Sequence, residues 1–187
     1  MPRVAEKLNI KSGHAISWID AMSERLKNRA DLQLAIVVPN KKYKNTKMDV
    51  DNITYYLVTE HASKNDWDEI LEDYRPDIIH VYGTELGHNF ELIKSKPDVP
   101  VIISLQGILT EYERFYYGGI DISKYFSNFT IRDLVFGSVF KERRKFQKNA
   151  VREQYMLQNV SYVEGRTDWD RVASININPK LQYYYCP

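Results

Sequence analysis

Two short, continuous apolar runs constrain the fold of this 187-residue chain more than any other feature. DIIHVYG occupies residues 77–83 and PVIISLQG occupies residues 100–107. Strands that are buried on both faces have this composition, which is typical of parallel sheets. The helical stretch from Thr84 to about Lys94 is long enough for the crossover that two parallel strands require. We therefore predict a βαβ unit over residues 77–107.

The rest of the chain continues this alternation of helices and strands. Apolar residues recur every three or four positions through residues 14–28, as in an amphipathic helix that Ser12 can cap. Residues 39–47 are expected to form an exposed loop. Further strands are expected at 32–38, 53–58, 160–165 and 182–186. One helix is expected from about 65 to 74, capped by Asn65 or Asp66, and a longer one from 132 or 138 to 158. A short helix is expected to follow Thr167, which caps it together with Asp170. The pattern predicts an α/β fold with a doubly wound, mainly parallel sheet and helices on both faces.

The composition limits the partners and the location of the chain. Lysine and arginine (26) nearly balance aspartate and glutamate (25), which argues against a general attraction to nucleic acid. No run approaches the roughly 20 apolar residues that span a bilayer, and the N-terminus lacks the apolar core of a signal peptide. The single cysteine, Cys186, precludes an internal disulfide and is expected to be a buried small apolar residue. These features favour a cytoplasmic location.

Polar or glycine-containing turns follow the expected strands. Open parallel sheets bind ligands beyond the carboxyl ends of their strands, where helix N-termini direct N–H groups into the crevice. A glycine in such a turn either admits a ligand close to the backbone or simply makes the turn. The residues predicted to line a cleft are Gly13, His14, His80, Gly83, Thr84, Glu85, Gln106, Gly107, Glu164, Arg166 and Thr167.

The chemistry of four of these residues can be weighed individually. His80 lies inside an apolar strand and is either a hydrogen-bonded core histidine or a group that faces the cleft. Glu85, expected in the first turn of a helix, is a candidate acid, base or ligand for sugar hydroxyls. Gln106 cannot be a base, but its amide can hold hydroxyl groups. Arg166 can contact phosphate or carboxylate, or form a surface ion pair. No catalytic residue is assigned.

Several common kinds of site have no signature in the sequence. GxGxxG, GxxxxGK[ST], HExxH, paired CxxC and GxSxG motifs do not occur. This argues against a dinucleotide enzyme, a P-loop ATPase, a zinc hydrolase and an α/β-hydrolase. A receiver-like signalling domain would need a cluster of aspartates at its strand ends, which is also missing. No metal site and no bound cofactor are expected.

An aromatic and basic section follows the second apolar run. Residues 111–129 carry seven aromatic residues around a Gly-Gly pair, and KERRKFQK at 141–148 has five positive charges. Aromatic faces suit sugar rings or a membrane interface, and the cations suit anionic lipid or polyphosphate. Alternatively, a helical flap packs its aromatic residues inward and leaves a solvated charged face. We expect a helical insertion at about 108–158, with possible peripheral contact to an anionic membrane through 111–148.

The order and spacing of these segments resemble the N-terminal domain of the GT-B glycosyltransferases, especially the retaining glycosyltransferase family 4. SGHAISWIDAMSERL resembles the glycine-containing loop and first helix of that family, and PDIIHVYG resembles its strand of the type PDIIH-x-H. Tyr82 stands where the second histidine is frequent, and Gln106 in SLQG stands where the family often has the histidine of T-x-HG. YVEGRTDWDRV, with Thr167 at the expected helix start, is the most distinctive part of the resemblance.

The resemblance implies a Rossmann-like, three-layer acceptor-side domain over residues 1–187, with its first strand apparently missing and the C-terminal donor domain absent from this chain. The implied reaction transfers a sugar from a nucleotide sugar, the donor substrate, to a hydroxyl of a polysaccharide or lipid-linked glycan, without a required metal. The fragment alone is expected to be inactive. The implied location is cytoplasmic, with possible contact at the inner face of the membrane. The alternative is a non-catalytic Rossmann-like module that binds a ligand or a partner.

Overall fold

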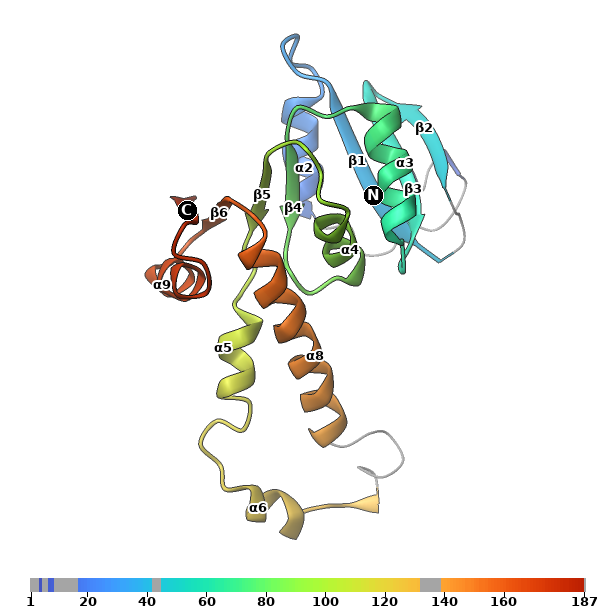
Figure 1. The fold of residues 1–187 in the computed structure, drawn as a ribbon. Coiled ribbons are helices and arrows are strands. Elements are labelled where there is room, and N and C mark those ends of the chain that lie inside the picture. Colours follow the sequence, from blue (N-terminus) through green and yellow to red (C-terminus); the bar gives the residue numbers. More distant parts are fainter. Residues whose placement is uncertain (1–3, 5–6, 9–16, 42–44, 132–138, 187) are drawn as a thin grey trace. The chain divides into compact units, whose positions relative to one another are not determined.

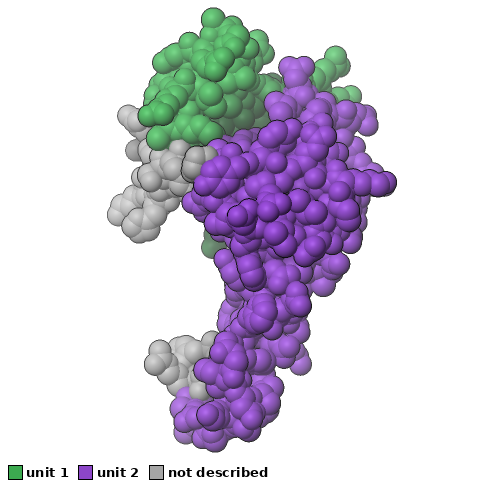
Figure 2. Space-filling view, turned by 90° about the vertical axis from the view of Figure 1, so that its left-hand side faces the viewer, with its two compact units in different colours: residues 1–75 green, residues 76–187 purple. Residues whose placement is uncertain are grey.

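The chain has an α/β fold and divides into two compact units, residues 1–75 and 76–187 (Figures 1 and 2). The computed structural model describes residues 4, 7–8, 17–41, 45–131 and 139–186. The predicted α/β class and the parallel strands are confirmed. The described strands form two hydrogen-bonded sheets, one in each unit.

The first unit contains a three-stranded mixed sheet in the order β1-β3-β2. β1 (Leu34–Asn40) runs parallel to β3 (Ile53–Thr59), and β2 (Thr46–Val50) runs antiparallel to it. Two helices of this unit lie wholly within the described residues, α2 (Ser17–Leu26) and α3 (Lys64–Tyr74). Tyr55 of β3 is fully buried and packs with Val4, whereas the hydroxyl of Tyr56 donates to Asp73 of α3. β3 is therefore the central strand of this unit and is covered on both faces.

The exposed loop predicted at residues 39–47 is wrong in part. β1 continues through Pro39 because β1 is an edge strand, where a missing N–H group breaks no ladder bond on the open side. β2 begins at Thr46 and joins β3 through Asp51 and Asn52, whose φ angles are +50° and +62°. Two successive residues with positive φ make a type I′ turn, which is a favoured connection for a two-residue hairpin.

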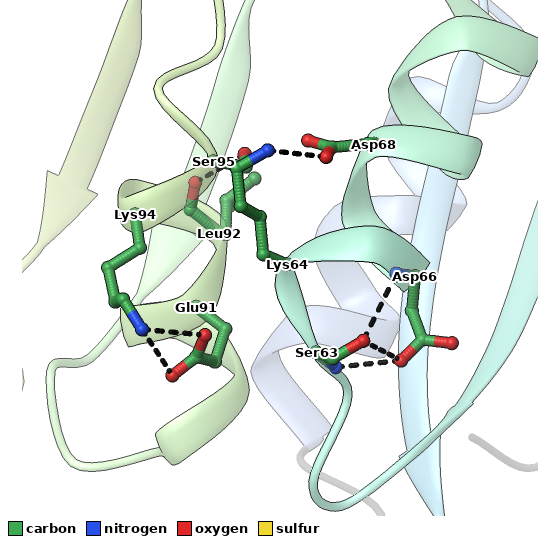
Figure 3. A network of polar contacts seen from close by, with 8 residues as sticks. All are labelled: Ser63, Lys64, Asp66, Asp68, Glu91, Leu92, Lys94 and Ser95. Atoms are coloured by element: carbon green, nitrogen blue, oxygen red, sulfur yellow. Dashed lines mark hydrogen bonds and ion pairs between the residues drawn. The ribbon is translucent and has the colours of Figure 1, made fainter.

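The start of α3 also differs from the prediction. Its N-cap is Ser63, rather than Asn65 or Asp66. The hydroxyl of Ser63 accepts from the backbone N–H of Asp66 (3.4 Å), and the carboxylate of Asp66 accepts from the N–H of Ser63 (2.7 Å) (Figure 3). This reciprocal capping box satisfies two N–H groups that the helix itself leaves unpaired.

The second unit contains a four-stranded parallel sheet in the order β4-β5-β6-β7. The strands are β4 (Ile79–Tyr82), β5 (Val101–Ser104), β6 (Tyr162–Gly165) and β7 (Gln182–Tyr185). α4 (Gly87–Ser95) connects β4 to β5, which confirms the predicted βαβ unit. α9 (Asp168–Ile177) connects β6 to β7 and has the predicted capping box of Thr167 and Asp170.

Three helices are described between β5 and β6, in residues 105–131 and 139–161. They are α5 (Leu109–Arg114), α6 (Ile122–Ser127) and α8 (Val139–Gln158), and α5 lies beside α8 (Figure 1). The section that was predicted to be irregular therefore contains two short helices. Both predicted starts of the long helix, Arg132 and Ser138, lie outside the described residues. Within the described ranges, no helix is both long enough and apolar enough to span a bilayer.

Two further predictions in this unit are corrected. Glu85 does not lie in the first turn of a helix, because α4 begins at Gly87 with Leu86 as its N-cap. Cys186 is exposed rather than buried, because it follows the end of β7, an edge strand whose last residue, Tyr185, is itself 68% exposed.

Candidate functional site

The two faces of the parallel sheet differ in chemistry. Successive side chains of a strand point to opposite faces, so the strand register determines which residues share a face. Val81, Ile103 and Val163 share one face, and their exposed fractions are 4%, 0% and 0%. Tyr82, Ser104 and Glu164 are aligned across β4, β5 and β6 on the other face. Apolar packing thus occupies one face, and polar groups gather on the other.

Four side chains on the polar face form a hydrogen-bonded cluster, here called the polar row: His80, Tyr82, Ser104 and Glu164. His80 Nε2 lies 2.5 Å from Ser104 Oγ and 3.2 Å from Glu164 Oε1, and the hydroxyl of Ser104 donates to the same carboxylate oxygen. The hydroxyl of Tyr82 lies 3.0 Å from His80 Nδ1. The bonds are all satisfied if Tyr82 donates to Nδ1 and the Nε2–H group donates towards Ser104 and Glu164. The donors then run in one direction and end on the carboxylate.

Burial shifts the protonation of two members of the polar row. It lowers the pKa of His80 below its usual 6.5, although the charge and hydrogen bond of Glu164 partly oppose this change. Burial, followed by the charges of Glu164 and Cys186, raises the pKa of Tyr82 to about 12. Near neutral pH, His80 is therefore an uncharged imidazole and Tyr82 keeps its proton. The hydroxyl hydrogens of Tyr82 and Ser104 are used within the row, so the row presents hydroxyl and carboxylate oxygens as acceptors, to which the hydroxyl groups of a ligand can donate.

A second carboxyl group, that of Glu153 on α8, holds the loops beyond the sheet together. It is fully buried and accepts four hydrogen bonds. The donors are Thr84 Oγ1 (2.5 Å), Leu109 N (3.1 Å), Thr110 N (2.8 Å) and Thr110 Oγ1 (2.7 Å). Glu153 therefore fixes the turn after β4 to the first residues of α5. Because Gln106 and Gly107 lie just before Ile108, the N-cap of α5, the same contacts help to set their position.

The turn that follows β4 is tightly built. The side chain of Asn89 donates to the carbonyl oxygens of Tyr82 (3.1 Å) and Gly83 (3.0 Å). Gly83 has a φ of +76°, and a side chain at this position would meet the carboxylate of Glu85. Thr84 is only 2% exposed and is bound to Glu153, so its hydroxyl is part of the interior. Glu85 is half-buried and remains the residue of this turn with a carboxylate near the surface.

The turn after β6 is occupied by helix capping. Thr167 Oγ1 accepts from the backbone N–H of Asp170 (3.1 Å). The carboxylate of Asp170 accepts from the N–H groups of Arg166 and Thr167, both at 3.1 Å. The Arg166 side chain is exposed. The backbone N–H groups at residues 166 and 167 therefore already have a protein acceptor, whereas the Arg166 guanidinium can extend over the sheet edge.

The structure brings the predicted site residues together in part. Glu85, Gln106 and Arg166 follow β4, β5 and β6, which are adjacent parallel strands, so all three lie at the same edge of the sheet. The backbones of neighbouring strands are about 5 Å apart where the strands end, so the three turns start side by side. Gln106 is exposed, and the ring of Tyr112 lies against Gly107. His80 and Glu164 are in direct contact within the polar row. Gly13 and His14 lie outside the described residues.

Two important residues were not singled out from the sequence. Ser104 was predicted only as part of a strand, yet it links His80 to Glu164. The available signal was a hydroxyl residue within an apolar run, two positions before Gln106. Glu153 was predicted only as part of a helix. Its signal was a carboxylate in line with the buried residues Ala150 and Leu157, at the spacing of one helix face.

The described surface also has an open recess of about 600 Å³ in the first unit. Its walls include Lys27, Arg29, Asp49 and Tyr74, and Arg29 is paired with Asp31 at 2.6 Å. None of the predicted site residues that the structure describes lines this recess. The recess therefore shares no residue with the polar row.

Among the described residues, no group of three or more histidine, cysteine, aspartate and glutamate side chains is arranged to hold a metal ion. No model of a known protein family matches the chain, and a search of characterised proteins finds no match either. The geometry of the second unit is therefore the basis for the functional proposal.

Proposed function

We propose that this chain is the acceptor-side domain of a retaining GT-B glycosyltransferase, in which a sugar passes from a nucleotide sugar to a hydroxyl of a polysaccharide or lipid-linked glycan. The observation that carries the proposal is the polar row, which lies on a parallel sheet whose strands β4, β5 and β6 are followed by turns that contain Glu85, Gln106 and Arg166. Parallel sheets bind their ligands at this edge.

The chemistry of the polar row supports a hydroxylated ligand. Carboxylate and hydroxyl groups pair well with sugar hydroxyls, which both donate and accept. Glu164 is the proposed acceptor for a sugar hydroxyl, and the Gln106 amide would hold another. An uncharged His80 and a protonated Tyr82 keep the row free of cationic groups, which favours neutral sugars over anions. The donor nucleotide sugar would bind to a second domain of the GT-B type.

A binding experiment tests this assignment. The ¹⁵N-labelled chain would be titrated with a panel of methyl glycosides and short oligosaccharides, and we expect chemical shift changes at residues 83–85, 105–107 and 164–167. Glu164→Gln should weaken binding about tenfold, because a hydrogen bond to a charged group is lost. Glu69→Gln, which changes an exposed carboxylate on α3, is the matched control. If no saccharide perturbs these residues, the assignment is wrong.

An activity measurement distinguishes the two halves of the proposal. Residues 1–187, incubated with a panel of nucleotide sugars and with any saccharide that binds, should give no transfer product. A product would show that these residues contain a complete enzyme. Saturable binding of a compound other than a saccharide at the polar row would instead favour the non-catalytic Rossmann-like binding module.

A further inference from the structure

Exposed apolar side chains gather on one segment of the second unit. Residues 112–131 contain seven of the exposed large apolar side chains of the described chain. Five of them form what is here called the apolar tip, with their exposed fractions: Ile120 (50%), Ile122 (43%), Phe126 (63%), Phe129 (41%) and Ile131 (83%). Apolar side chains concentrated in this way on a surface indicate a contact with an apolar partner.

Two tyrosines of the same segment, Tyr116 and Tyr117, pack against other side chains of the unit. The ring of Tyr116 packs on Phe146 (centroids 5.4 Å apart), and the ring of Tyr117 packs on Tyr125 (5.1 Å) and under the guanidinium of Arg143 (4.8 Å). These contacts fix the segment to the first turns of α8. The tyrosine rings therefore hold this segment against α8. The phenylalanine and isoleucine side chains of the tip stay largely exposed on the segment that these contacts hold in place.

A stripe of cations begins beside the apolar tip. Phe126 stacks on Phe140 (5.1 Å), and the exposed residues Lys141, Arg144, Lys145 and Lys148, here called the basic stripe, follow along α8. At about 100° per residue, these four positions fall within an arc of about 100°, and Ala150 and Glu153 face roughly the opposite way. The basic stripe therefore points away from the packed side of the helix. It extends over about 10 Å of the helix axis.

We propose that the apolar tip and the basic stripe form a docking surface for an anionic lipid bilayer. Residues 139–152 carry six lysine or arginine residues and one glutamate, a net charge of 6 − 1 = +5. Interfacial segments bury apolar side chains roughly 5–10 Å into the bilayer, and lysine and arginine beside them contact anionic headgroups. The basic stripe starts one residue after Phe140, on which Phe126 stacks, so cations lie directly beside the apolar tip as this layering requires. The large excess of positive charge, next to exposed phenylalanine and isoleucine, fits an anionic lipid surface better than a protein surface with balanced charges.

A vesicle flotation experiment with the whole chain tests the proposal. The protein should float with vesicles of phosphatidylcholine and phosphatidylglycerol at low salt, and much less with phosphatidylcholine alone. The triple variant Lys141→Glu, Arg144→Glu, Lys145→Glu should reduce the partition coefficient about tenfold or more. Phe126→Ser with Ile131→Ser should also reduce it about tenfold, because apolar surface no longer leaves water on binding.

Matched variants keep the experiment decisive. Lys41→Glu, Lys96→Glu and Lys180→Glu make the same change in net charge at exposed positions elsewhere, and Ile78→Ser with Val172→Ser removes exposed apolar side chains outside the tip and the basic stripe. Both sets should float like the unmodified chain, and circular dichroism should show that every variant is folded. The proposal would be overturned if the control charge variant lost as much flotation as the basic-stripe variant, or if the unmodified chain did not float. A dimer in sedimentation velocity that the tip variant dissociates would also overturn it, because a second copy would then cover the tip.

This inference does not depend on the proposed function. A chain that binds vesicles but no saccharide would retain the docking surface and lose the glycosyltransferase assignment. If the chain binds saccharides but not vesicles, the glycosyltransferase assignment stands and the docking surface is refuted.

Discussion

The second unit contains two carboxyl groups that receive hydroxyl donors, and their surroundings differ. Glu153 is fully buried and is surrounded by four donors from two loops. The Glu164 side chain remains 21% exposed and contacts Ser104 and His80 on the polar face of the sheet. A buried carboxyl group whose acceptor positions are all occupied stabilises the fold, whereas a carboxyl group at the surface can also bind a ligand. The comparison predicts that changing Glu153 affects stability and that changing Glu164 affects binding.

The largest effect is expected for Glu153→Ala. It would leave the Thr84 hydroxyl and the N–H groups of Leu109 and Thr110 buried without an acceptor, at a cost of about 2–4 kcal/mol in the free energy of unfolding. Urea denaturation followed by circular dichroism measures this cost. Gln154→Ala, at the next and exposed position of the same helix, should change stability by less than about 0.5 kcal/mol. Equal effects of the two substitutions would remove the distinction between the carboxyl groups.

The next largest effect is expected at the turn after β4. Gly83→Ala places a side chain at a φ of +76° and displaces the carboxylate of Glu85, so we expect a loss of about 1–2 kcal/mol. Gly118 also has a positive φ, +58°, but a side chain there would have no neighbour within 4 Å. Gly118→Ala therefore measures the backbone cost alone. Thermal unfolding of both variants should show the greater loss for Gly83→Ala, and the reverse order would contradict the tight packing of this turn.

The strands of the second unit and the start of α9 were the most predictable features because their signals are local. The apolar runs ending at Tyr82 and Ser104 are strands, and the Thr167 and Asp170 pair caps α9 as the spacing predicts. In the first unit, β2 was missed because TKMDV at residues 46–50 follows a lysine-rich stretch and has few apolar residues. Its strand conformation depends on pairing with β3 and on the turn at Asp51 and Asn52.

The candidate site was less predictable because it depends on register. The sequence indicated His80 and Glu164, but only the alignment of β4, β5 and β6 shows that Ser104 lies between them. Thr84 was predicted to line a cleft, and no local signal indicated that its hydroxyl would reach a carboxylate 69 residues later in the chain. Contacts of this range follow from tertiary packing, which a single sequence does not reveal.

A smaller effect is expected from the protonation of His80. Its pKa in the folded chain is lowered by burial, so the unfolded chain binds more protons near pH 6. The contribution of His80 to stability is therefore complete above the unfolded pKa of about 6.5 and is lost as the pH falls through that value towards the folded pKa. Urea denaturation at several pH values should show a shallower fall in stability for His80→Gln than for the unmodified chain. An unchanged pH dependence would contradict the lowered pKa.

Glu164→Gln is expected to have the smallest effect on stability. It is also the most direct test of how the partly exposed carboxylate of Glu164 acts on the polar row. The amide keeps the shape of the side chain and can still accept from Ser104, so the free energy of unfolding should change by less than about 1 kcal/mol. The two neighbouring pKa values should both fall. The pKa of His80 falls because no carboxylate then stabilises the imidazolium, and the pKa of Tyr82 falls from about 12 because no negative charge then opposes the phenolate. NMR titration of the His80 ring and ultraviolet titration of tyrosine measure these shifts. If neither pKa moves, Glu164 is not coupled to the polar row, and its distinction from Glu153 would rest on burial alone.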